Sequence, residues 1–162
     1  MNYEKNGYPK AYLPAGRFDH EEMRFVDLVA DLLLLKSDFS IWHFIRLDDN
    51  YVTRCQVEVS YSDDVAGEVQ FRITPNKRFR SIEQTENLVG TSWVKSHSTS
   101  VSWTRSMYDP SSTIGANHLM AGVRALVGFD PSSGFKVRAK DVFSQPKIDQ
   151  VLNAHNVWGV PA

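Results

Sequence analysis

The chain has 162 residues, of which 42% are apolar and 23% are charged, and 18 basic against 19 acidic side chains give a net charge of −1. This composition is typical of a globular protein with one hydrophobic core. A balance so close to zero argues against wholesale electrostatic attraction to nucleic acid or to an anionic membrane, so only local basic patches remain for such binding.

Cys55 is the only cysteine, which excludes an intrachain disulfide and a thiolate-rich metal site. We expect it to be a small buried side chain rather than a reactive nucleophile. The first residues lack a basic region followed by an apolar run, and the longest apolar stretch, Leu32–Leu35, is too short to span a bilayer. These features predict a soluble protein of a reducing, cytoplasmic compartment.

Residues 1–18 contain tyrosines, prolines and glycines without periodicity, which predicts an extended N-terminal arm. Residues 19–162 are expected to form a single α+β domain. The aromatic side chains of the two chain ends either cover the core of their own domain or reach a neighbouring subunit. The residues expected to form such an interface are Tyr8, Tyr12 and Trp158.

The clearest helix is predicted to begin at Asp19 and to end near Lys36. Asp19 can cap the first turn, and Glu22 three residues later completes a variant of the capping box. Apolar residues then recur at helical spacing. They are Phe25, Leu28, Val29, Leu32 and Leu35.

Antiparallel strands are predicted next, over residues 41–47, 52–61 and 69–73. In the second of these, Cys55, Val57 and Val59 alternate with Arg54, Gln56 and Glu58. The first set should face the core and the second set the solvent. The third strand continues the buried face after a hairpin loop at residues 63–67.

A weaker strand is predicted over residues 78–85, followed by a serine-rich strand or strand pair over residues 91–105. Alternation places Trp93 and Trp103 on the same side of this segment and most of its serines on the other. We therefore expect both indoles to enter the core together, with the hydroxyl groups turned outward.

Three further elements complete the prediction: a second helix over residues 113–127, a strand over residues 135–139, and a short helix that starts at Ser144 and Pro146. Small residues in the second helix, such as Gly115 and Gly122, permit close approach of a neighbour. Together the elements predict an α+β fold, with an antiparallel sheet of about five or six strands and two main helices packed mostly on one face.

A basic constellation is the main candidate binding site. One group falls within nine residues that contain no acid, and a second group alternates along one face of the strand over residues 135–139. If the two strands were neighbours, they would form a patch of about seven positive charges that binds phosphate backbones, with an aromatic side chain for base stacking. Alternatively, these side chains are only the solvated face of a sheet. The residues are Arg72, Lys77, Arg78, Phe79, Arg80, Lys136, Arg138 and Lys140.

Catalytic motifs are weak. The triplet His97-Ser98-Thr99 is similar to one of the two motifs of two-histidine phosphodiesterases, but the chain contains no second one. Neither a Gly-x-Ser-x-Gly elbow nor a phosphate-binding glycine loop is present, and the five histidines lie far apart in the sequence. We expect no metal site, no cofactor and no catalytic residues.

Three functions remain open. The leading hypothesis is a non-enzymatic interaction or assembly module, for example a structural protein that self-associates, because catalytic motifs are missing and both chain ends carry aromatic residues. The second is a nucleic-acid-binding protein that uses the basic sheet face. The third is a small hydrolase or phosphodiesterase-like enzyme, with His97, His43 and an acid brought together by the fold.

Overall fold

The computed structural model describes residues 11–12, 18–47, 50–76, 92–96, 101–128, 134–155 and 158–159. Its helices are α1 (Phe18–Leu33), α3 (Ser112–Val127) and α4 (Gln145–Ala154), preceded by a single 3-10 turn, η1 (Val142–Ser144). The three helices fall where the sequence predicts them. The strands are β1 (Ala11–Tyr12), β2 (Phe39–Leu47), β3 (Asn50–Tyr61), β4 (Glu68–Pro75), β5 (Val94–Ser96), β6 (Ser102–Tyr108), β7 (Gly134–Ala139) and β8 (Trp158–Gly159).

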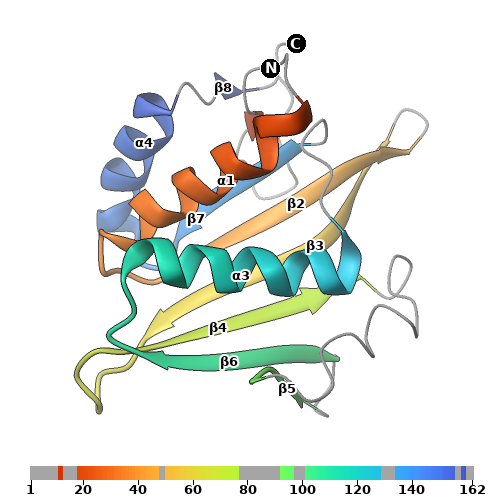
Figure 1. Cartoon of the computed structure of the whole chain (residues 1–162). Helices are drawn as coiled ribbons and strands as arrows, with labels where there is room; N and C mark the ends of the chain where they lie inside the picture. The colour runs from red at the N-terminus through yellow and green to blue at the C-terminus, as the bar shows by residue number, and fades with distance from the viewer. Residues whose placement is uncertain are drawn as a thin grey trace.

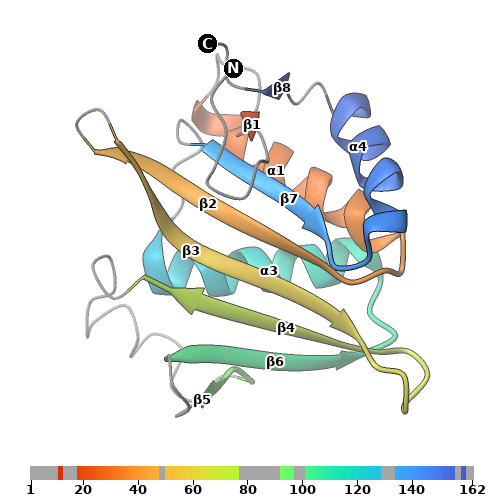
Figure 2. The ribbon, with the colours of Figure 1, turned by 180° about the vertical axis from the view of Figure 1, so that it is seen from behind.

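All paired strands are antiparallel and form one sheet in the order β5-β6-β4-β3-β2-β7-β1-β8. Figure 1 shows α1, α3 and α4 in one layer in front of this sheet, and Figure 2 shows its opposite face without a helix across it. The predicted α+β class is therefore confirmed. Six strands have three or more residues, and the two-residue strands β1 and β8 extend the sheet at one edge.

The helix-covered face of the sheet supplies half of the core. Its side chains alternate with polar ones along each strand, as the sequence predicts, because neighbouring residues point to opposite faces. Phe25 of α1 packs edge-on against Phe135 of β7, with ring centroids 5.4 Å apart. The sheet residues in this core are Phe39, Ile41, Cys55, Val57, Val59, Val69, Phe71, Ile73, Trp103, Phe135, Val137 and Ala139.

The serine-rich segment is a strand pair rather than one long strand. β5 and β6 pair so that Lys95 lies opposite Trp103. Trp93 and Trp103 are each only 5% exposed, so the prediction that both indoles enter the core is confirmed. The expectation for the serines is only partly met, because Ser92 is exposed but Ser102 is buried.

A β-bulge changes the place of Arg54, which the strict alternation predicted on the solvent face. The β2–β3 register shifts between His43 and Phe44, so Cys55 pairs with His43 and Thr53 with Phe44. Arg54 is the extra residue, since a bulge opposes two residues to one. Its Nε donates to the carbonyl oxygen of Val127 at 2.9 Å, at the end of α3. The guanidinium therefore complements the negative end of that helix.

The two ends of the described chain meet at one edge of the sheet. Tyr12 of β1 pairs with Trp158 of β8, and Ala11 pairs with Phe135 of β7. The side chains of Tyr12 and Trp158, and all of Tyr8, lie outside what the structure describes, so their role at an interface stays a prediction. Among the described residues, none of the helices is both apolar enough and long enough to cross a bilayer.

Candidate functional site

The uncovered face of the sheet carries a shallow hollow of about 390 Å³. Strands β2, β3, β4 and β7 form its floor, and the loop residue Asp38 and the post-strand residue Lys140 lie at its rim. Figure 2 shows these four strands side by side on the face turned away from the helices. The polar and aromatic side chains that line the hollow are Asp38, Ser40, Trp42, Glu58, Ser60, Gln70, Arg72, Arg138 and Lys140.

Strand register explains why these residues share one surface. Arg72 pairs with Glu58, Glu58 pairs with Ser40, and Ser40 pairs with Arg138, so these four residues form one row across the sheet. Directly paired residues of antiparallel strands point to the same face. A second row crosses the same face two residues further along β2, and in it Trp42 lies between Gln56 and Lys136.

The basic residues predicted from the sequence are therefore brought together only in part. Arg72, Lys136, Arg138 and Lys140 belong to this one face, but β4 and β7 are not neighbours, because β3 and β2 lie between them. At the usual strand spacing this separates Arg72 from Arg138 by about 14 Å. The other predicted residues lie outside the described part of the chain. They are Lys77, Arg78, Phe79 and Arg80.

Lys136 has a different position from the one expected of a solvated strand face. Its side chain is only 6% exposed, and its ammonium lies 4.7 Å from the centre of the Trp42 ring. A cation over an indole face is attracted by the ring quadrupole. Lys136 therefore helps to fix the orientation of Trp42, and its own contact with a ligand stays a prediction.

The charges around the hollow are mixed, with a small cationic excess. Arg72, Arg138 and Lys140 face Asp38 and Glu58. The Glu58 carboxylate lies 3.7 Å from the Arg72 guanidinium, and Gln56 donates to it at 3.5 Å. Glu58 is thus engaged with its strand neighbours, while Lys140 at the rim is exposed. An anion entering the hollow meets cations on both sides of one central carboxylate.

Trp42 is the site residue that sequence reasoning missed. The run over residues 41–47 reads as uniformly apolar, and this hides the fact that Trp42 alternates with the buried Ile41 and His43. Its cross-strand partner Gln56 belongs to the solvent-facing set of the next strand. The alternation along β2 and the pairing with Gln56 together place Trp42 on the uncovered face. The pairing could not be read from the sequence, because it depends on the register of β2 and β3.

The helix-covered side of the sheet holds two side chains of potentially reactive types, His43 and Cys55. His43 pairs with Cys55, and both are buried in the core. Burial raises the pKa of the Cys55 thiol to about 12, against a smaller lowering by Arg54, so the group is a neutral thiol near neutral pH. The part of the chain that the structure covers contains no group of three or more histidine, cysteine, aspartate or glutamate side chains able to hold a metal ion. His97 lies outside that part.

No protein-family model, curated protein or solved structure matches this chain.

Proposed function

We propose that the protein binds single-stranded nucleic acid on the uncovered face of its sheet. One observation carries this proposal: a hollow on that face is bordered by an oriented tryptophan and by cations from two separate strands. Nonspecific single-strand binders combine positive charge, which follows the phosphate backbone, with aromatic rings on which bases stack.

The arrangement assigns a role to each part of the site. Trp42 provides a stacking surface, since it borders the hollow and is held by Lys136. Arg138 and Lys140 on one side and Arg72 on the other contact the phosphates that flank the stacked base. Ser40, Ser60 and Gln70 offer hydrogen-bonding groups on the floor between them.

A single strand suits this surface better than a duplex. Bases in a duplex are stacked on each other and present only their edges in the grooves, whereas unpaired bases expose a face to an indole. The site also has few cations, and a duplex binder usually presents a continuous basic stripe. The mixed charge of the hollow therefore favours a ligand held partly by stacking.

The proposal is tested by fluorescence anisotropy of a labelled single-stranded oligonucleotide titrated with the full chain at several salt concentrations. Contacts with three phosphates predict that log K falls against log salt with a slope of about −2. Trp42→Ala should weaken binding about tenfold, because one stacked base is lost. Trp42→Phe keeps an aromatic ring and should retain most of the affinity.

Two lysine variants provide a matched control. Lys140 lies at the rim of the hollow, whereas Lys147 lies on α4, in the helix layer, and both are exposed. Lys140→Gln should weaken binding and make the salt slope less steep by about 0.7, and Lys147→Gln should change neither quantity. Equal effects of the two variants, or binding that is independent of salt, would contradict the proposed site.

A further inference from the structure

One end of the molecule gathers most of the exposed apolar side chains. The C-terminal end of α1, the β3–β4 turn, the end of β6, the start of α3 and the β7–α4 turn all lie at this end, as Figure 1 shows. Of the eight large apolar side chains that are exposed in the described part of the chain, six belong to these segments. They are Leu34, Val65, Tyr108, Ile114, Val142 and Phe143.

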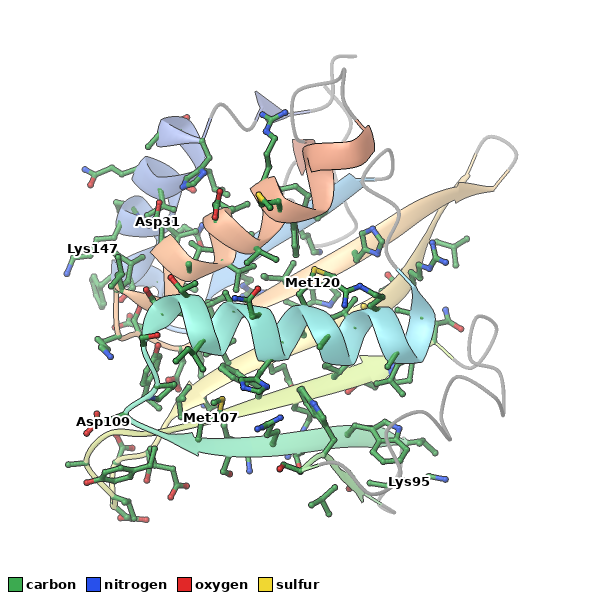
Figure 3. All side chains as sticks on the ribbon, viewed as in Figure 1. Asp31, Lys95, Met107, Asp109, Met120 and Lys147 are labelled. Atoms are coloured by element: carbon green, nitrogen blue, oxygen red, sulfur yellow. The ribbon has the colours of Figure 1, made fainter. Side chains whose placement is uncertain are left out.

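A second hollow, of about 350 Å³, opens between these segments on the helix side of the sheet. Leu33, Val69 and Phe71 give it an apolar wall, and Leu34 lies at its border with 61% of its side chain exposed. Lys36 and Asp109 also line it. Asp109 is labelled in Figure 3 at this end of the sheet. The hollow is thus an apolar depression with one charge of each sign beside it.

Phe143 is a projecting side chain at the same end, and 87% of its surface is exposed. The turn that carries it is firmly held. The Asp141 carboxylate accepts from the Phe143 amide at 3.0 Å, and the Ser144 amide donates to the Asp141 carbonyl at 2.9 Å. Gln145, directly after the turn, accepts from the Ala139 amide at 2.7 Å. An aromatic group fixed in an exposed position costs little ordering entropy when it binds.

We propose that this end of the molecule is the interface of a twofold dimer, in which Phe143 of each copy enters the second hollow of the other. A projection and a depression on the same surface are self-complementary under a twofold axis, because each copy provides both. Large aromatic side chains in apolar pockets are the usual anchors of such interfaces.

The charges beside the two features support a second copy as the partner. Lys140 and Asp141 immediately precede Val142 and Phe143, while Lys36 and Asp109 line the hollow. Each side therefore offers one cation and one carboxylate to the other, and complementary charges fix the register of an interface. Lys140 borders both surfaces, but Phe143 and Leu34 do not line the first hollow, so variants of these two residues test the dimer independently of nucleic-acid binding.

An anionic membrane is a poorer partner for the same surface. Amphipathic membrane contacts combine apolar groups with an excess of cations. At this end of the described structure the exposed carboxylates outnumber the exposed lysines Lys36, Lys140 and Lys147. The exposed carboxylates are those of Asp63, Asp64, Asp109 and Asp141.

The test is sedimentation equilibrium of the full chain over a wide concentration range, with variants of the projection and of the hollow. The wild type should dimerise. Phe143→Asp and Leu34→Asp should each weaken dimerisation about tenfold or more, because each buries a charge at the anchor. Met23→Asp is the matched control, since Met23 is similarly exposed (65%) but lies in α1, far from the C-terminal end that Leu34 directly follows. It should leave the association unchanged.

Mixing the two variants makes the test specific. A pair of Phe143→Asp and Leu34→Asp chains retains one intact projection and one intact hollow that face each other. The mixture should therefore form a dimer at concentrations where each variant alone is monomeric. Circular dichroism and thermal unfolding of each variant check that the fold is intact.

Three results would overturn the proposal: a wild type that is monomeric throughout, a Phe143→Asp variant that dimerises like the wild type, or a mixture that associates no better than its components. Binding to phosphatidylserine vesicles that is lost in Phe143→Asp, without dimerisation in solution, would assign the surface to a membrane instead.

Discussion

Gly122 lies in α3 at the point where the helix passes closest to the sheet. A methyl group at this position would lie 2.6 Å from an atom of the Trp93 ring and 2.8 Å from Cδ1 of Ile73. In an exposed helix the change from glycine to alanine would stabilise by about 1 kcal/mol. Here the added methyl group has no space, because Trp93 and Ile73 are both buried in the core.

Gly122→Ala should therefore destabilise the protein, by about 1–3 kcal/mol as is usual for overpacking. Gly115→Ala is the control on the same helix. Its added methyl would meet the end of the flexible Leu33 side chain at 3.1 Å, which can move aside. Urea unfolding should show the larger loss for Gly122→Ala, and an equal or opposite order would contradict the packing of Trp93 against α3.

Cys55 provides a second prediction, based on its ionisation. Burial raises the pKa of the thiol from its ordinary value of 9.0 to about 12. Between these values the unfolded chain has lost the proton while the folded chain keeps it. The free energy of unfolding should therefore fall as the pH rises above 9.0, with Cys55 contributing up to about 1.4 kcal/mol per pH unit.

Cys55→Ala removes this contribution and should flatten the alkaline part of the stability curve, which is measured by urea unfolding at several pH values. Burial also raises the pKa of Tyr61 to about 12, so Tyr61 makes the same contribution to the pH dependence of stability in both proteins. In addition, iodoacetamide should label the native thiol at neutral pH only after denaturant is added. Rapid labelling of the native protein would contradict the buried position.

At the scale of the elements, Asp38 connects three strands. Its carboxylate accepts from the Tyr61 amide of β3 at 2.8 Å, and its carbonyl oxygen accepts from the Lys140 amide after β7 at 3.0 Å. It directly precedes β2. The residue therefore fixes the register at the end of the sheet that both hollows share.

Asp38→Ala should lower the free energy of unfolding by about 1–2 kcal/mol, because the Tyr61 amide loses its partner. Asp38→Asn keeps an acceptor oxygen and should cost less. Thermal unfolding of the two variants checks the order. Asp38 also borders the hollow on the uncovered face as a carboxylate, so neither variant should weaken nucleic-acid binding. If Asp38→Ala weakened nucleic-acid binding, the purely structural role of Asp38 would be contradicted.

Most helices and strands could be predicted, because the signals for them lie within each element. The apolar spacing of α1, the alternation in β3 and β4, and the Ser144–Pro146 start of α4 are signals within one element. The bulge at Arg54 was not predictable, because it depends on how β2 and β3 align. Alternation alone also left open whether residues 91–105 form one strand or a strand pair, because the pairing of β5 with β6 is not a local signal.

At the scale of the whole molecule, the site depended on strand order. The sequence identified Arg72 and the β7 cations but could not show that two strands separate them. It also missed Trp42, whose place on the uncovered face follows from pairing with Gln56. The helices pack on one face of the sheet and enclose the core, and the opposite face carries the polar side chains of the first hollow.

This division leads to two proposed surfaces with separate roles: the uncovered sheet face for nucleic acid, and the apolar end for a second copy. A variant of a residue that belongs to only one of the two surfaces should leave the other surface unaffected. The Phe143→Asp variant should bind the oligonucleotide with the same affinity per chain as the wild type. The Trp42→Ala variant should dimerise as the wild type does in sedimentation equilibrium.

The most direct measurement is a nitrogen–proton correlation spectrum of the labelled protein during titration with a single-stranded oligonucleotide. The account predicts that the Trp42 indole signal and the backbone amides of β2, β3, β4 and β7 around the first hollow shift, while those of α1 and α3 stay in place. Shifts confined to the helix layer, or a spectrum that the oligonucleotide leaves unchanged, would contradict the account.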